Sequence, residues 1–179
     1  MDNGLIPRRY AKALYKYALE KGKTKEVYDL TKRVIAVFQE NPDLQKAMSN
    51  PFISEQDKES LMKTAAGVEN DDIFMQFVRL VISQKRIEYF YHILLAYRDI
   101  YRKENKISQA KITTAVKLDD DRMSKLRDLV KSAFKDSELE FSEAVNPDLI
   151  GGFIIDVDSV RMDASLSNEL EQLRQTLLS

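Results

Sequence analysis

The 179-residue chain has no cysteine, no tryptophan and a single histidine, and it has only five glycines and four prolines. Without cysteine, the chain forms no disulfide framework, thiolate metal site or thiol nucleophile. The one histidine, His92, has Tyr91 and Ile93 beside it, whereas catalytic and metal sites recruit several polar groups. We therefore expect His92 to have a structural or surface role.

Charge of one sign is not in excess, because 28 lysine and arginine residues stand against 29 aspartate and glutamate residues. Such a balance gives no electrostatic footprint for nucleic acid. The N-terminus carries charges where a signal peptide needs an apolar core, and no apolar run approaches the ~20 residues of a membrane span. We expect a chain that binds no nucleic acid and that is cytoplasmic unless other proteins hold it elsewhere.

Apolar residues recur at helical spacing from Ile6 to about Asn105, and short breakers separate the segments. Asn41-Pro42 and Asn50-Pro51 end helices, because the residue before a proline is pushed out of the α region. The pattern predicts five or six amphipathic helices with short links, which pack as a bundle. One face of the first helix carries Tyr10, Ala13, Leu14, Tyr17 and Ala18.

At Ile107 the apolar period changes from 3.6 residues to 2, which predicts a strand over about 110–118. Asp119-Asp-Asp then precedes a helix, and further strands are expected near 139–141, 153–157 and 160–162. Ser165 is a candidate N-cap of a last helix with leucines on one face. The pattern indicates a mainly α chain with a smaller α/β part, namely a helical domain over 1–105 and an α+β domain over 106–179.

Three features of the sequence are candidates for a binding or catalytic site. Gly151-Gly152 lacks the G-x-G-x-x-G spacing of a nucleotide loop, and we expect it to let the chain enter a crowded sheet. The three aspartates from Asp119 are consecutive, which favours helix capping over a calcium loop. None of these features therefore predicts a catalytic site. The alternative hypothesis is a small two-domain enzyme or ligand-binding protein whose site lies between the domains. Its candidate residues are Asp156, Arg161 and Asp163.

The face of the first helix that combines alanine with tyrosine has two possible uses. Small residues let another helix approach closely, and tyrosine offers a large contact area with a polar tip. Such a face is suited to a buried core. It is equally suited to one half of a groove that receives an amphipathic partner helix.

Motifs at both ends of the chain carry a resemblance to a known family. They are Arg9-Tyr-Ala-Lys-Ala-Leu14 in the helical part, and Leu149-Ile-Gly-Gly-Phe-Ile-Ile155, Asp163-Ala-Ser-Leu166 and Leu170-Glu-Gln-Leu-Arg174 near the C-terminus. Together they resemble the delta subunit family of the bacterial F-type ATP synthase, called OSCP in mitochondria, essentially end to end. The chain departs from the family at Ala164, where the family usually has glycine.

This resemblance implies a non-catalytic stator subunit of the peripheral stalk, with no cofactor and no metal. It would clamp the catalytic F1 head to the b-subunit stalk, so that rotor torque drives ATP synthesis coupled to proton transport. The resemblance also implies a six-helix N-terminal bundle and a position at the cytoplasmic face of the bacterial plasma membrane. The membrane would be reached only indirectly, through the complex.

The resemblance also implies two partner-binding sites. The N-terminal helix of an alpha subunit is expected in a groove made chiefly by the first and fifth helices, and the C-terminus of the b subunit is expected at the C-terminal domain. Periodicity alone does not separate groove-lining residues from core residues. The candidates for the alpha subunit are Tyr10, Ala11, Leu14, Val78, Leu80, Val81 and Ile82, and those for the b subunit are Leu166, Leu170, Leu173 and Leu177.

Overall fold

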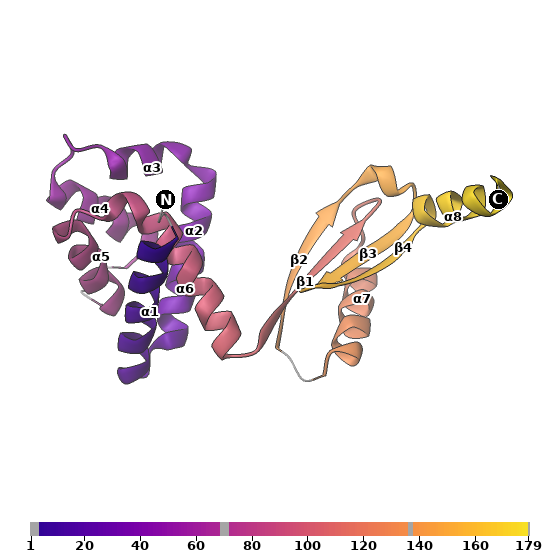
Figure 1. Ribbon diagram of the computed structural model, residues 1–179, viewed down its shortest axis with the longest axis horizontal. Coiled ribbons are helices and arrows are strands. Elements are labelled where there is room, and N and C mark those ends of the chain that lie inside the picture. Colours follow the sequence, from indigo (N-terminus) through magenta and orange to yellow (C-terminus); the bar gives the residue numbers. More distant parts are fainter. Residues whose placement is uncertain (1–3, 69–71, 136–137, 179) are drawn as a thin grey trace. The chain divides into compact units, whose positions relative to one another are not determined.

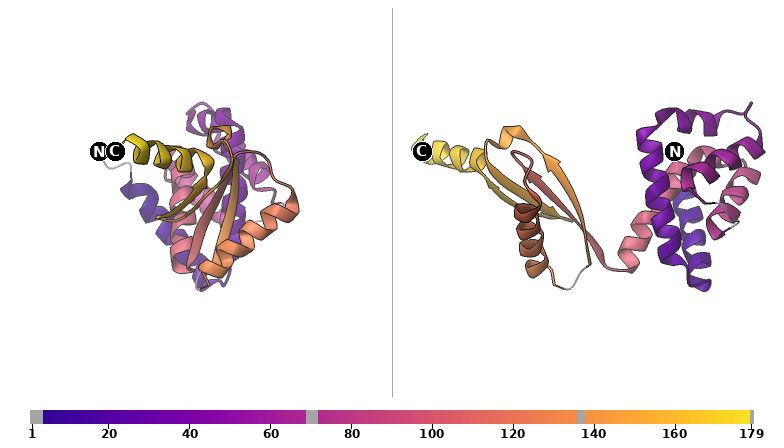
Figure 2. Two further views of the ribbon diagram at one scale, coloured as in Figure 1. Left: turned by 90° about the vertical axis from the view of Figure 1, so that its right-hand side faces the viewer. Right: turned by 180° about the vertical axis from the view of Figure 1, so that it is seen from behind.

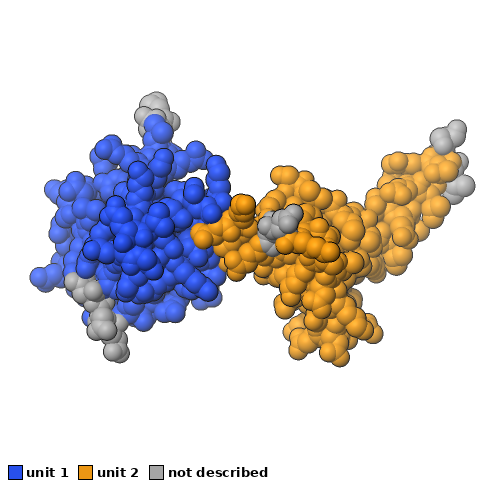
Figure 3. Space-filling view, turned by 90° about the horizontal axis from the view of Figure 1, so that it is seen from below, with its two compact units in different colours: residues 1–104 blue, residues 105–179 orange. Residues whose placement is uncertain are grey.

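A computed structural model of the chain describes residues 4–68, 72–135 and 138–178. The chain divides into two compact units, Met1–Glu104 and Asn105–Ser179, which are coloured separately in Figure 3.

The first unit is helical (Figure 1). Its helices end where the sequence supplies breakers: Gly22 and Gly67 have positive φ, and Pro42 starts a helix at its first position. The hydroxyl of Ser54 accepts a hydrogen bond from the backbone N–H of Asp57, so Ser54 is the N-cap of the helix that follows it. The elements are α1 (Leu5–Glu20), α2 (Thr24–Glu40), α3 (Pro42–Ser49), α4 (Glu55–Ala66), α5 (Ile73–Ser83), the 3-10 turn η1 (Ile87–Tyr89) and α6 (Phe90–Glu104).

Aromatic side chains form a continuous line through this unit. The ring of Tyr10 on α1 meets Phe77 on α5 at a centroid distance of 6.5 Å, and Phe77 meets Phe90 on α6 at 6.3 Å. Phe74 reaches the other side of Phe90 at 6.1 Å. The buried hydroxyl of Tyr97 donates a hydrogen bond to the Thr24 carbonyl at 3.1 Å. The core therefore joins α1, α5 and α6, and Tyr10 at its edge belongs both to the core and to the surface.

The second unit is a four-stranded mixed sheet with two helices (Figure 1). The strand order is β2-β1-β3-β4, with β1 parallel to β2 and antiparallel to β3, and with β4 antiparallel to β3. The first strand of the unit is thus a central one. The elements are β1 (Ile107–Thr114), α7 (Asp120–Ala133), β2 (Glu138–Val145), the 3-10 turn η2 (Pro147–Leu149), β3 (Gly152–Val157), β4 (Val160–Ser165) and α8 (Leu166–Leu178).

Helix α7 covers one face of this sheet (Figure 2). Met123 and Val130 on α7 pack into one cluster with Ala110 and Ile112 on β1 and with Ile155 on β3. The carboxylate of Asp119 accepts a hydrogen bond from the Arg122 backbone N–H at 2.8 Å, which confirms helix capping. The core of this unit is therefore one apolar layer between a helix and one face of a sheet.

Strand β1 is shorter than the sequence pattern predicts. It ends at Thr114, whose carbonyl accepts a hydrogen bond from the Asn146 backbone N–H at 2.8 Å. The Thr114 hydroxyl donates to the carbonyl of Val116 at 2.8 Å, which turns the chain, and Val116 is exposed. Alternation in the sequence continued beyond the strand, but local hydrogen bonds at Thr114 ended the ladder.

Crowding in the sheet requires glycine at position 152, the second glycine of the pair, as the sequence predicts. Gly152 has φ +75, and a Cβ there would lie 2.1 Å from the carbonyl oxygen of Ala164. Ala164 itself pairs with Phe153 in the β3–β4 ladder and is not among the residues with positive φ. The departure from the family pattern at Ala164 is therefore accommodated by ordinary strand geometry, and the constraint lies at Gly152.

Candidate partner-binding sites

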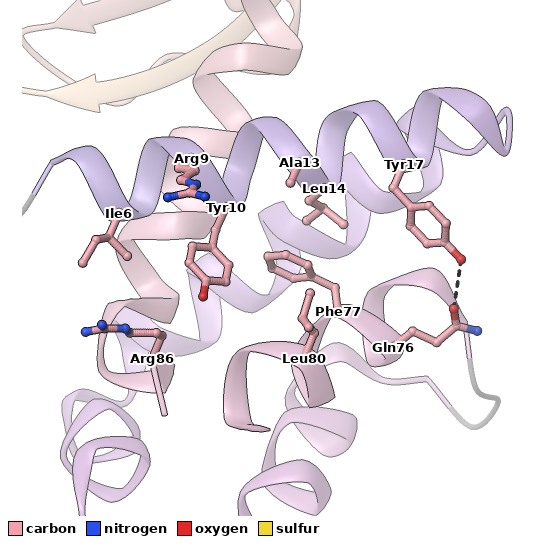
Figure 4. A pocket seen from close by; sticks show the side chains of 10 residues that line it. All are labelled: Ile6, Arg9, Tyr10, Ala13, Leu14, Tyr17, Gln76, Phe77, Leu80 and Arg86. Carbon is pink, nitrogen blue, oxygen red and sulfur yellow. Dashed lines mark hydrogen bonds between the residues drawn. The ribbon is translucent and has the colours of Figure 1, made fainter. Parts of the chain in front are cut away.

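A groove of about 670 Å³ lies between α1 and α5 in the first unit (Figure 4). Its walls are mostly apolar and its ends are polar. Residues four apart fall on one helix face, so Ile6, Tyr10 and Leu14 share the side of α1 that faces α5. The lining residues are Ile6, Arg9, Tyr10, Ala13, Leu14, Tyr17, Gln76, Phe77, Leu80 and Arg86.

The floor of this groove is fixed by the core. Phe77 lines the groove, yet it is buried and its ring packs against both Tyr10 and Phe90. Ala13 adds no bulk, so the wall of α1 stays open between the larger side chains. Leu80, which is 49% exposed, forms part of the opposite wall on α5. The shape of the groove therefore exists before any partner binds.

The two ends of the groove differ in their polar groups. Arg9 and Arg86 line it near Ile6, and within the described ranges neither guanidinium makes an ion pair (Figure 4). Near the other end, the hydroxyl of Tyr17 donates a hydrogen bond to the Gln76 side-chain carbonyl at 3.1 Å. One end is thus basic and available to carboxylates, and the other end is closed by a neutral hydrogen bond.

The structure separates the residues that the sequence proposed for this groove. Tyr10, Leu14 and Leu80 line it. Ala11, Val78 and Val81 are 0% exposed, belong to the core and are not among the residues that line the groove. Ile82 is also buried and lines a different cavity.

Several groove residues were not selected from the sequence. Tyr17 and Ala13 fall on the predicted face of α1, so the helical period could have found them. Phe77 on α5 is harder to find, because it lies in a mostly apolar stretch of the helix. Val78 and Val81 are as apolar as Phe77, and only packing distinguishes the groove side of this helix from its core side.

The leucines of α8 lie on the surface of the second unit. Leu166, Leu170 and Leu173 are 46%, 55% and 59% exposed. Leu177 is in α8, but its side chain lies outside the part of the chain that the structure describes. The hydroxyl of Ser165 accepts a hydrogen bond from the Asn168 backbone N–H at 3.3 Å, so the predicted N-cap is confirmed. The helix offers an apolar stripe without a covering element among the described residues.

The polar residues of the proposed interdomain site bind one another or the backbone. The guanidinium of Arg161 donates to both carboxylate oxygens of Asp156, at 2.6 and 3.2 Å, and this hydrogen bond raises the pKa of Arg161. The hydrogen bond from the Ser165 hydroxyl to Asp163 lowers the pKa of that carboxyl. Asp163 is therefore held ionised at neutral pH, which suits a structural acceptor and not a proton donor.

Two further properties concern the described residues. Within residues 4–68, 72–135 and 138–178, no group of three or more histidine, aspartate or glutamate side chains could hold a metal ion. Over the same part of the chain, no helix has both the length and the apolar character needed to span a membrane.

An open apolar groove and an exposed leucine helix are typical of proteins that bind partner chains. The model of the ATP synthase delta (OSCP) subunit family matches residues 6–177, and the chain belongs to this family. Proteins named ATP synthase subunit delta are 38% identical in Parabacteroides distasonis and 33% identical in Bacteroides thetaiotaomicron. These alignments cover 99% of this chain in both cases, and 98% and 96% of the respective relatives.

A solved structure has the same fold. It is a chain in the cryo-EM structure of the Toxoplasma gondii mitochondrial ATP synthase hexamer, with a TM-score of 0.70 at 19% identity and with 97% of each chain covered. The chain is mainly helical with a small mixed sheet, as the sequence predicts. The family is a non-catalytic subunit of the ATP synthase, so the alternative of a small enzyme is wrong.

Proposed function

We propose that this chain is the stator subunit that clamps the catalytic F1 head to the b-subunit stalk. Proton flux turns the rotor, and without a stator the head would turn with it. The preformed groove between α1 and α5 is the observation that carries the proposal. The helical domain, residues 1–105, is a six-helix bundle that binds the alpha subunit, and residues 106–179 contact the b subunit.

The alpha-subunit N-terminus binds the groove as an amphipathic helix. Its apolar side, with anchors at i, i+3 and i+4, lies on Tyr10 and Leu14 of α1 and on Leu80 of α5, as in helix-in-groove recognition. An acidic residue of the bound helix lies near Arg9 and Arg86, because these cations have no carboxylate partner within the described ranges. The basic end thereby sets the direction of the bound helix.

A stator must dissociate slowly while it bears load. A groove whose floor is part of the core loses little conformational entropy on binding, and this preorganisation favours affinity. Aromatic and aliphatic anchors in a desolvated groove mainly slow dissociation. Tyr10 and Phe77 supply such anchors, and their mutual ring contact at 6.5 Å holds them in place.

The C-terminus of the b subunit binds the leucine stripe of α8, namely Leu166, Leu170, Leu173 and Leu177. Three of these side chains are exposed, and exposed leucines at helical spacing form the seam of a helix–helix contact. Through b, the chain associates peripherally with the cytoplasmic face of the bacterial plasma membrane.

Calorimetry with a peptide of the alpha-subunit N-terminus tests the groove. We expect Leu80→Asp in the full chain to weaken binding roughly thirtyfold, because a charge replaces a central apolar anchor. Leu19→Asp is the matched control, since Leu19 is 60% exposed on α1 and does not line the groove. Equal affinities of the two variants, both folded, would contradict the groove assignment.

Co-purification with the b subunit tests the second site. The double variant Leu170→Asp with Leu173→Asp should lose b while it retains the alpha peptide. Leu129→Asp serves as control, because Leu129 is exposed to the same degree as these leucines but lies on α7. If the double variant still binds b as the wild type does, α8 is not the contact.

A further inference from the structure

A second cavity in the first unit, of about 350 Å³, lies away from the groove. It is formed by the link from α3 to α4, the start of α4, the end of α5 and η1. Its size is at the lower end of small-molecule sites. Its lining combines apolar and charged side chains: Ser49, Pro51, Ile53, Glu55, Lys58, Ile82, Lys85, Ile87 and Glu88.

Lys58 is the unusual residue of this cavity. It is only 8% exposed, and within the described ranges its ammonium group makes no ion pair or hydrogen bond. Its Nζ is not among the described polar atoms that are sealed from solvent, so the ammonium reaches solvent, and the residue lines the cavity. A lysine that is more than nine-tenths buried usually has a partner for its charge, and this ammonium has none within the described ranges.

The other charged side chains restrict what the partner of Lys58 can be. Glu55, Lys85 and Glu88 line the same cavity, and all three are exposed. The two carboxylates balance the two ammonium groups, so the cavity lacks the excess positive charge that a dianion such as phosphate needs, whereas a single negative charge can pair with Lys58. Ile53 and Ile87 give the cavity apolar walls.

We propose that this cavity binds a small monoanion, a carboxylate on a short apolar stem, with the carboxylate on the ammonium of Lys58. The stem lies against Ile53 and Ile87. The carboxylate belongs either to a free short-chain acid or to the C-terminus of a peptide that ends in an apolar residue. This site is independent of the clamp proposed above, because its residues do not line the groove between α1 and α5.

Amide chemical shifts of the full chain test the proposal, with hexanoate as the free acid and N-acetyl-leucine as the peptide C-terminus. Both should shift amides near Ser49, Lys58 and Ile87. The neutral analogues hexanol and N-acetyl-leucinamide should bind at least tenfold more weakly. The tighter of the two carboxylates identifies the source of the ligand.

Variants of α4 complete the test. Lys58→Met keeps the apolar stem of the side chain and removes the charge, and we expect it to weaken carboxylate binding at least tenfold. Lys63→Met is the control, since Lys63 is exposed on the same helix and does not line the cavity. No saturable shifts with either carboxylate, or equal binding by both folded variants, would overturn the proposal and leave Lys58 as a lysine whose stem alone is buried.

Discussion

In the first unit, the candidate surface is part of the core, whereas in the second unit it stands outside any core. Phe77 forms the floor of the groove and also packs against Phe90 in the interior. Leu170 and Leu173 of α8 are more than half exposed and are not in the core cluster of the sheet. A concave site built from core residues is rigid before binding, whereas the exposed leucines of α8 become buried only when a partner binds.

The stability of each unit can be measured separately. All eight tyrosines precede Asn105 and the chain has no tryptophan, so tyrosine fluorescence reports on the first unit alone. Amide exchange of β1 and β3 reports on the second unit.

The largest expected effect is that of Gly152→Ala on the second unit. Its Cβ would lie 2.1 Å from the Ala164 carbonyl oxygen, and φ +75 is strained for alanine. We expect a loss of about 4 kcal/mol in the free energy of unfolding of the sheet. Exchange of the β3 amides measures the loss, and tyrosine fluorescence should be unchanged.

Gly22→Ala is the matched control for this substitution. Gly22 has φ +66, but nothing lies within 4 Å of a Cβ built there. It should cost about 1 kcal/mol, from backbone strain alone. Equal losses from both substitutions would show that the contact with Ala164 does not constrain the sheet.

A smaller effect distinguishes the two candidate surfaces directly. Phe77→Ala should lower the free energy of unfolding of the first unit by about 3 kcal/mol, because it removes a buried ring. Leu173→Ala should change the stability of the second unit by less than about 0.5 kcal/mol, because that side chain is exposed. Denaturant titrations followed by fluorescence and by amide exchange measure both. A marked loss from Leu173→Ala would mean that α8 packs on its own unit.

The smallest expected effect is a pH dependence of opposite sign in the two units. Burial raises the pKa of Tyr97, so its hydroxyl stays protonated in the folded first unit at a pH where it ionises in the unfolded chain. The first unit therefore loses stability as the pH rises above about 10. The Ser165 hydroxyl lowers the pKa of Asp163, so that contribution is present above about pH 4 and is lost as the pH falls further.

Single substitutions separate these two contributions. Tyr97→Phe should flatten the alkaline dependence of the fluorescence transition, and Asp163→Asn should flatten the acid dependence of the second unit. If Tyr97→Phe left the alkaline slope unchanged, the buried hydroxyl would not be its source.

The sequence predicts the elements of this chain better than it predicts their contacts. Helical period locates α1, and the change of period at Ile107 locates β1. The same signal cannot distinguish Leu80 in the groove from Val81 in the core, since both are apolar and adjacent. Lys58 resembles an ordinary surface lysine in the sequence, because its burial depends on α3, α5 and η1, which pack around it from distant positions. The spacing of apolar residues predicts which side chains are buried, whereas their contacts depend on how the elements pack in three dimensions.

The central position of β1 has a mechanical consequence. The chain leaves the first unit at Glu104 and enters the sheet through β1, which is hydrogen-bonded to β2 on one side and to β3 on the other. A pull along the chain from the first unit must therefore slide this strand past both neighbours at once, and many hydrogen bonds resist together. Had the connection entered at β4, an edge strand, the same pull would be resisted by hydrogen bonds to β3 alone.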